Sequence, residues 1–293
     1  MAAALWGLSP VATKGALAGY SPELISVIRL GLASLLFRAV GGRGAVGGRS
    51  APWLPRDRWS LVAGVALGAD FLLYNYGLRL TTAALAGLVI NVEVVSTIVL
   101  ALCFLGERLT ARGALGAAVT LLGVAYVATG GVRLADLLAH ERILGNAMVM
   151  LAGIAWSLYA VAQRRAPRRR SLFQLMAPIF AVAMLTTLPG LLLSSAWHNP
   201  GGGFPTLMLA ALIVLCTVAV YLAYARSQEL VDVSVLAIAL ASIPVFAVAF
   251  ARLLLAEPIS ARVVAGGGVI LAGLLVIATE RRRAPEYGAW PAG

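Results

Sequence analysis

The chain has 293 residues, of which 61% are hydrophobic and only 12% are charged. That charged share is about half the usual value for soluble domains. A bilayer core about 30 Å thick needs roughly 20 apolar residues per helix, so ten helices would use roughly 200 residues and leave no room for a soluble domain. The formal net charge of +11 would suggest nucleic-acid binding in a soluble protein. Because the basic residues here lie between apolar segments, we exclude nucleic acid as a partner.

The apolar segments, taken in chain order, predict an all-α membrane protein with ten transmembrane helices. The start of the second segment carries a capping hydroxyl, a first-turn proline and an acid in Ser21-Pro22-Glu23, which helix ends favour. Thr110 and Ser260 stand at equivalent places before the fifth and tenth segments. The predicted helices are 2–18, 22–40, 59–78, 83–105, 113–129, 143–163, 172–194, 205–225, 233–256 and 263–280.

The second half of the chain repeats the first at a constant offset of 150 residues. Trp6 recurs as Trp156, and Glu107 recurs as Glu257 at the start of a similar six-residue run. Each half carries five apolar segments, and an odd number makes the second copy enter the membrane from the opposite side. We therefore predict two inverted five-helix repeats, over residues 1–130 and 143–283, an arrangement typical of secondary transporters.

The distribution of arginine predicts the orientation of the chain. Most arginines fall on one side of the membrane if the N-terminus is inside, and the positive-inside rule then places both termini in the cytoplasm. Arginine outnumbers lysine by 22 to 1, which is typical of a GC-rich bacterial gene, so we expect a multi-pass protein of the bacterial inner (plasma) membrane. The arginines assigned to the inner side are Arg43, Arg49, Arg56, Arg58, Arg108, Arg112, Arg164, Arg165, Arg168, Arg169, Arg170, Arg226, Arg281, Arg282 and Arg283.

Glycines recur seven residues apart in the fifth and tenth segments, at Gly116 and Gly123 and again at Gly266 and Gly273. Small residues on one face allow two membrane helices to pack backbone to backbone. We expect close packing within the fold, with a dimer contact as the alternative; a monomer or a weak dimer is consistent with this pattern.

Acidic residues inside the apolar segments are the first candidates for a functional site, because ionisable groups within the bilayer are costly and mark pathways by default. Asp70 is near the middle of the third segment, and Glu93 is near the middle of the fourth, two residues after Asn91. Burial in an apolar environment disfavours the charged carboxylate, so Glu93 is expected to be neutral without a cationic partner. Glu93 could bind a cationic substrate group or exchange a proton during transport; the alternative is a protonated carboxyl that serves packing alone.

Aromatic and polar side chains form stripes on equivalent segments of the two halves. Tyr74 is one turn from Asp70 and is followed by Asn75. Residues with the spacing i, i+3 and i+4 lie on one helix face. Helix packing is an alternative explanation for such stripes, but their pairing by the repeat favours a binding site. The other stripe residues are Trp6, Trp156, Tyr159, Gln163, Tyr221 and Tyr224.

Motifs for other chemistries are absent from the sequence. His140 and His198 have no second metal ligand at helical spacing, so we predict no metal site. The sequence contains no G-x-S-x-G or H-E-x-x-H run, and we predict neither catalytic residues nor a cofactor. Arg29 in the second segment could form a structural pair with Glu23 or contact an anion.

At these residues the chain resembles the EamA-type transporters of the drug/metabolite transporter superfamily, over essentially its whole length. The resemblance implies ten helices, cytoplasmic termini, and a central cavity formed by the first, third, fourth, sixth, eighth and ninth helices. The proline that the family has in the fourth helix is Val94 here, whereas the second copy keeps it as Pro244. The runs that carry the resemblance are Leu5-Trp6-Gly7 with Lys14, Arg29, Thr81-Thr82-Ala83-Ala84, Leu105-Gly106-Glu107-Arg108-Leu109, Ser242-Ile243-Pro244-Val245 and Leu255-Ala256-Glu257-Pro258.

The sequence therefore predicts a transporter rather than an enzyme. We expect it to export small metabolites, with amino acids or amphiphilic amines as substrates, by alternating access in the lipid bilayer. Protons remain open as a coupling ion. The alternatives are an uptake carrier for anionic or phosphorylated metabolites, which would need basic residues in the cavity, and a membrane scaffold without transport.

Overall fold

The computed structural model describes residues 2–43, 52–80, 89–90, 92–107, 109–128, 140–167, 172–193, 202–240, 242–243, 246 and 261–278. Within these residues every regular element is a helix. The elements are α1 (Ala2–Leu17), α2 (Pro22–Arg43), α3 (Arg58–Leu80), α5 (Val92–Leu105), α6 (Ala111–Ala128), α8 (His140–Arg165), α9 (Leu172–Leu193), α10 (Gly203–Ile213), η1 (Val214–Ala219), α11 (Val220–Leu230), α12 (Val233–Leu240) and α14 (Ala261–Ala278).

Several helices begin where their capping residues predict. The backbone N–H of Leu24 donates to the hydroxyl of Ser21 at 3.3 Å, and that of Gly113 donates to the hydroxyl of Thr110 at 3.0 Å. These bonds occupy backbone donors that the first turn of a helix cannot satisfy by itself. The predicted starts of α2 and α6 are thus confirmed to within two residues.

The helices form a bundle whose surface is strongly apolar. Four of them are long and apolar enough to cross a membrane: Pro22–Gly41, Ile143–Arg165, Leu172–Leu192 and Gly203–Leu230. Many large apolar side chains are exposed on the outside, among them Leu122, Leu192 and Leu275, each at least 65% exposed. Such a surface is unfavourable in water and is expected next to lipid.

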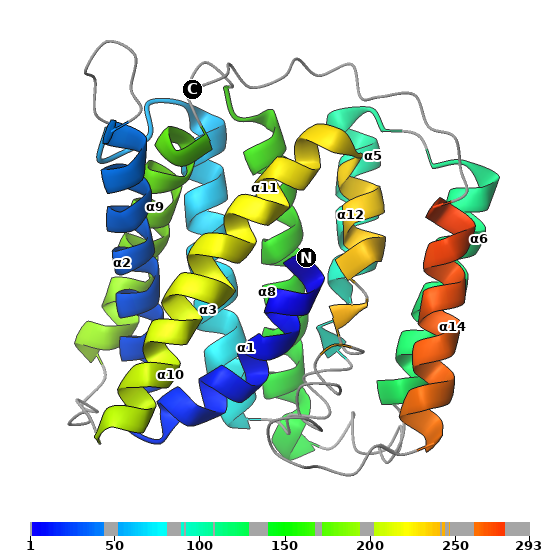
Figure 1. Cartoon of the computed structure of the whole chain (residues 1–293), viewed down its shortest axis with the longest axis horizontal. Helices are drawn as coiled ribbons and strands as arrows, with labels where there is room; N and C mark the ends of the chain where they lie inside the picture. Colours follow the sequence, from blue (N-terminus) through cyan, green and yellow to red (C-terminus); the bar gives the residue numbers. More distant parts are fainter. Residues whose placement is uncertain are drawn as a thin grey trace.

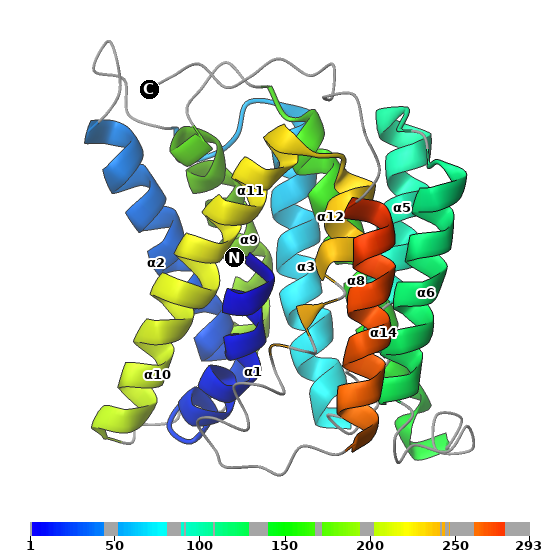
Figure 2. The ribbon, with the colours of Figure 1, turned by 45° about the vertical axis from the view of Figure 1, so that its right-hand side comes forward.

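The helices of the bundle pack against one another in pairs. Helix α2 packs against α9, α3 packs against both α8 and α9, and α6 packs against α14 at one edge of the bundle (Figures 1 and 2). Helix α12 packs against α5, and α1 packs against α10. Phe37 and Phe180 join α2 to α9, with their ring centroids 5.1 Å apart.

Glycines bring α6 and α14 together as predicted. A Cβ atom at Gly123 would lie 3.0 Å from the carbonyl oxygen of Gly266, and one at Gly273 would lie 2.8 Å from the carbonyl oxygen of Gly116. These two contacts are related by the 150-residue offset. The close packing expected from the glycine spacing therefore occurs within the fold.

Two predicted helices differ from the structure in the interior of the bundle. The fourth segment was expected to be helical over 83–105. Residues 83–88 and 91 lie outside the described residues; residue 89 is helical, but a turn at Ile90 interrupts the helix, and α5 begins at Val92. Helix α12 ends at Leu240, and most of the predicted stretch to residue 256 lies outside the described residues. In addition, the predicted helix 205–225 extends over α10, η1 and α11, with a π-helical segment in the middle.

Candidate functional site

An aromatic cluster occupies the interior between α1, α8 and α11. We use this name for Trp6, Trp156, Tyr159, Tyr221 and Tyr224. The rings of Trp6 and Trp156 are 5.2 Å apart, and Trp6 also contacts Tyr221 at 5.4 Å and Tyr224 at 5.6 Å. Trp156 contacts Tyr159 at 5.1 Å. These separations are within the range of favourable edge-to-face and offset ring contacts.

The repeat-related tryptophans therefore meet in space. Trp6 and Trp156 hold the same position in the two halves of the chain, and their rings are nearly perpendicular at 87°. Trp6 is half-buried, whereas Trp156 and the three tyrosines are buried. The sequence predicted both residues as site candidates, and the structure brings them into one cluster.

Besides the hydroxyl of Tyr224 in α11, two polar atoms on α8 at the aromatic cluster are buried without a hydrogen bond to any described residue. They are the hydroxyl of Tyr159 and the Oε1 atom of Gln163. Both side chains come from α8, one turn apart, and both are at most 4% exposed. Buried polar atoms nearly always have a partner, so these are the atoms that a bound polar solute or water would satisfy.

Two carboxylates lie beside the aromatic cluster. Asp70 belongs to α3 and Glu93 to the first turn of α5, and we call them the acidic pair. Their charges interact with each other, Tyr74 on α3 interacts with both, and Tyr221 of the cluster also interacts with both. Asp70, Glu93 and Tyr74 are all half-buried. A partly accessible pair of acids next to aromatic rings is suited to a cationic group.

Glu93 holds a different place in its helix from the one the sequence predicts. It was expected near the middle of a continuous helix, but it is the second residue of α5, and its backbone N–H donates to the carbonyl of Ile90 at 3.0 Å. The break fits against α8 at Gly153, where a Cβ atom would lie 3.0 Å from the Ile90 oxygen. A helix N-terminus favours a negative side chain, so this position stabilises a carboxylate better than the middle of a helix would.

Hydroxyl groups hold the start of α5 in place. Ser157 on α8 donates to the backbone carbonyl of Glu93 at 3.0 Å and to that of Gly153 at 2.9 Å. Thr97 donates to the Ser157 hydroxyl at 2.9 Å, and the hydroxyls of Ser96 and Ser157 are 2.6 Å apart. Sequence reasoning missed these three residues. The adjacent hydroxyls in α5 and the glycine four residues before Ser157 were the available signals.

Arg29 faces the same region from α2. Its Nε donates to the hydroxyl of Thr217, and its Nη2 donates to the carbonyl of Cys216 at 2.8 Å, both within η1. The guanidinium carbon is 5.1 Å from the ring centroid of Phe71, and its charge acts on Asp70. The contacts of Arg29 with described residues are therefore with η1 and Phe71.

The two asparagines predicted for the site, Asn75 and Asn91, are not seen to contact the acidic pair in the part of the chain that the structure describes. The amide of Asn75 donates to the hydroxyl of Ser26 at 2.6 Å, so it joins α3 to the start of α2 and does not belong to the acidic pair. Asn91 lies outside the described residues. Within the described residues no group of three or more His, Cys, Asp or Glu side chains gathers as metal ligands.

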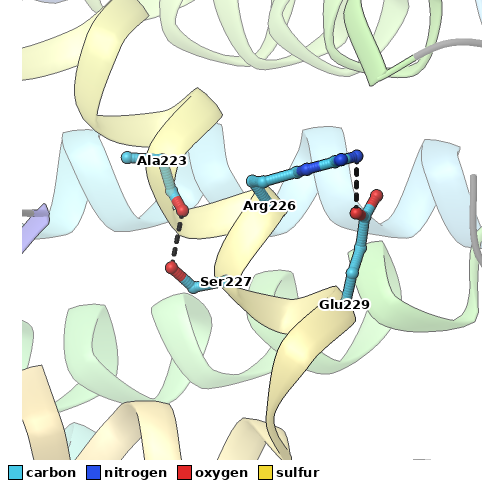
Figure 3. A network of polar contacts seen from close by, with 4 residues as sticks. All are labelled: Ala223, Arg226, Ser227 and Glu229. Atoms are coloured by element: carbon cyan, nitrogen blue, oxygen red, sulfur yellow. Dashed lines mark hydrogen bonds and ion pairs between the residues drawn. The ribbon is translucent and has the colours of Figure 1, made fainter. Parts of the chain in front are cut away.

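Charged groups at the helix ends have structural roles. The carboxylate of Glu107 accepts a hydrogen bond of 2.8 Å from the backbone N–H of Val233 at the start of α12. Figure 3 shows another such end, where Arg226 and Glu229 of α11 form an ion pair of 2.7 Å beside the bond from Ser227 to Ala223. These contacts fix helix ends and are separate from the acidic pair.

The sequence profile of the EamA-like transporter family matches residues 1–129 and 143–279. The chain belongs to this family. The family places it in the drug/metabolite transporter superfamily and identifies it as a multi-pass membrane transporter rather than an enzyme. The resemblance found in the sequence motifs is thereby confirmed.

Individual relatives of this EamA-family protein agree with that assignment. An uncharacterized transporter of Archaeoglobus fulgidus is 25% identical over 279 residues, covering 94% of the chain and 95% of the relative. A probable terminal-alkyne amino-acid exporter of Streptantibioticus cattleyicolor is 31% identical over 147 residues, covering 50% of the chain and 46% of the exporter. A solved crystal structure superposes with a TM-score of 0.79 at 24% identity, covering 95% of this chain and 93% of the other, and shows a shared fold.

Proposed function

We propose that this protein is a secondary transporter that exports small amine-bearing metabolites, chiefly amino acids or amphiphilic amines, by alternating access. The observation that carries the proposal is the position of the acidic pair next to the aromatic cluster. In an EamA-family protein an intramembrane acid is a functional residue by default, and here two acids share one partly accessible region.

The chemistry of the site suits an ammonium group attached to an apolar body. Glu93 and Asp70 supply negative charge for the ammonium, while the rings of Trp156 and Tyr159 supply apolar surface. A cation placed over an aromatic face gains about 0.5–2 kcal/mol, more as water is excluded. Tyr74 and Gln163 add polar groups along the same walls, and Asn91 is retained as a candidate from the sequence alone.

Several contacts support an inverted repeat as the basis of alternating access. Trp6 meets its counterpart Trp156, and α6 meets its counterpart α14 through the related glycine contacts. Helices α2 and α9 are likewise counterparts that pack together. The break at Ile90 and the end of α12 at Leu240 are also separated by 150 residues. Interrupted helices at a repeat interface are a common site architecture in transporters.

In this proposal the ten-helix chain lies in a bacterial inner membrane with both termini in the cytoplasm and works as a monomer or weak dimer. The substrate gradient and a proton gradient are the two candidate driving forces for export, and the acidic pair supplies carboxyl groups for either. The probable amino-acid exporter among the relatives supports amino acids as the substrate class.

Transport in proteoliposomes tests this function. Purified protein is reconstituted, and counterflow of radiolabelled amino acids and amines is compared between wild type and Glu93→Gln. The matched control is Glu229→Gln, which removes a carboxylate from the helix-end pair with Arg226. We expect Glu93→Gln to lose most of the counterflow while the control retains it. Equal flux in both variants would show that Glu93 does not bind substrate.

Uptake of anionic metabolites is the competing hypothesis. Arg29 supports it, because its positive charge is half-buried near the site. Two acids beside one arginine nevertheless give the region a negative balance, which favours cationic groups. Counterflow of an organic phosphate that is lost in Arg29→Gln and retained in Glu93→Gln would support the competing hypothesis.

A further inference from the structure

Arg29 is a positive charge that interacts with Asp70 of the acidic pair, and the proposed amine site does not use it. It lies on α2, seven residues after Pro22, or about 10 Å along the helix. Asp70 lies on the neighbouring helix α3, next to the Phe71 ring that Arg29 contacts at 5.1 Å. The described residues form no ion pair with Arg29 within 4 Å. The positive charge of Arg29 and the acidic pair thus act on one region without forming a direct ion pair.

The hydrogen bonds of Arg29 leave one edge of its guanidinium open. A guanidinium has five N–H donors in a planar fork. The Nε and Nη2 atoms, which form one edge, donate to Thr217 and to the carbonyl of Cys216. The edge formed by Nη1 and the second hydrogen of Nη2 has no partner among the described residues, and a carboxylate fits such an edge with two parallel bonds.

The π-helical segment η1 explains why Arg29 is held there. The Thr217 hydroxyl also donates to the carbonyl of Leu212 at 2.8 Å, five residues earlier, and the Cys216 thiol donates to the carbonyl of Leu5 in α1 at 3.4 Å. The segment therefore connects α1, α2 and the α10–α11 helix. It fixes one edge of the guanidinium and so determines which edge remains open.

Tyr221 interacts with both the basic and the acidic groups of this region. It belongs to the aromatic cluster, one turn after Thr217, and it interacts electrostatically with Arg29, Asp70 and Glu93. A ligand lying against this ring is exposed to the charge of one cation and of two acids. The region thus has separate places for a carboxylate, an ammonium and an apolar side chain.

We propose that Arg29 binds the carboxylate of an α-amino acid whose ammonium lies at Asp70 and Glu93, so that the site selects amino acids over the corresponding amines. This inference rests on the proposed export function and narrows its substrate class. A site built to bond a polar substrate group discriminates against the analogue that lacks the group, because its own polar atoms are then left unpaired. With a charged, two-bond contact we expect discrimination of about tenfold to 100-fold.

Matched ligand pairs test the inference on the full-length protein in lipid nanodiscs. Each pair consists of an amino acid and its decarboxylation product: leucine with 3-methylbutylamine, and phenylalanine with 2-phenylethylamine. Dissociation constants are measured for wild type, Arg29→Gln, Arg29→Lys and Thr217→Val. The last variant keeps the size of the side chain and the charge of Arg29 but removes the hydroxyl that Arg29 bonds.

Wild type is expected to bind each amino acid at least about tenfold more tightly than its amine. Arg29→Gln should lose this preference through weaker binding of the amino acid while binding the amine at least as well as wild type, because a nearby positive charge is removed. Thr217→Val should reduce the preference only in part, because Arg29 keeps its charge and its bond to the carbonyl of Cys216. If Arg29→Gln cannot be purified, the wild-type ratio and a reduced ratio in Arg29→Lys, whose single ammonium cannot form the two-bond contact, provide the same test.

Four results would overturn the inference. Equal binding of the amino acid and the amine to wild type, with both dependent on Glu93, would leave the export proposal standing and remove the role of Arg29. An unchanged preference in Arg29→Gln, or an equal loss in Thr217→Val, would assign Arg29 to holding η1 alone. Binding of neither ligand to wild type would overturn the proposed function, and this inference with it.

Discussion

Replacing Gly273 by alanine is expected to push α14 away from α6. A Cβ atom there would lie 2.7 Å from the backbone nitrogen of Thr120 and 2.8 Å from the carbonyl oxygen of Gly116. Both atoms belong to the backbone of α6, so they cannot rotate aside, and one helix has to move. Overpacking of this kind costs about 1–3 kcal/mol, against which alanine regains up to about 1 kcal/mol in helix propensity. We therefore expect Gly273→Ala to lower the free energy of unfolding by up to about 2 kcal/mol.

Helix α14 also provides the matched control. A Cβ atom at Gly268 meets no atom within 4 Å, so Gly268→Ala is expected to be neutral or stabilising by up to about 1 kcal/mol. Equilibrium unfolding in mixed detergent micelles, followed by circular dichroism, measures both variants. If the two substitutions change the unfolding free energy equally, the close contact between α6 and α14 does not exist in the membrane protein.

Three other substitutions test the site and its supports. Trp156→Ala is expected to slow counterflow of aromatic amino acids at least about tenfold more than that of alanine, since it removes a ring that contacts four others; equal slowing of both substrates in the proteoliposome assay would refute this. Ser157→Ala should destabilise the protein by about 1–2 kcal/mol, because it leaves the hydroxyl cluster at the start of α5 unpaired, whereas Ser227→Ala on the outer part of α11 should change stability by less than about 0.5 kcal/mol. Glu107→Ala should cost about 0.5–2 kcal/mol in thermal or denaturant unfolding by removing the cap of α12, and Glu107→Gln, which keeps an acceptor oxygen, should cost less.

Local sequence rules predict the helix ends and the apolar surface well. Ser21 and Thr110 cap their helices because a hydroxyl at that position bonds the nearby backbone in any protein. The glycine spacing predicts the contact of α6 with α14 for a similar reason: the absence of a side chain at Gly123 and Gly273 is a property of the sequence itself. Structural features that depend on one helix alone, or on two equivalent helices, can therefore be predicted from the sequence.

The start of α5 could not be predicted in the same way. Its apolar residues continue without a sequence break through Glu93, and they predict one uninterrupted helix. The observed turn at Ile90 depends on α8, where Gly153 allows the backbones to approach and Ser157 bonds the carbonyl of Glu93. Nothing in the local sequence of α5 specifies that partner, and the same holds for the π-helical segment that bonds Arg29.

The candidate site was predicted by residue type more reliably than by arrangement. Helical spacing placed Trp156 and Tyr159 on one face, and the repeat paired Trp6 with Trp156, which agrees with the observed ring contacts. Spacing could not separate Asn75 from its neighbour Tyr74, since both are polar and adjacent. Only the packing of α3 against the start of α2 reveals that the Asn75 amide bonds Ser26.

A structure determined with a counterflow-active amine or amino acid bound tests the central claim most directly. The quantity to measure is the distance from the ligand ammonium nitrogen to the nearest carboxylate oxygen of Glu93 or Asp70. The proposed site predicts an ion-pair distance of about 4 Å or less, with the apolar part of the ligand against Trp156. A ligand bound elsewhere, with both carboxylates contacting protein atoms alone, would contradict it.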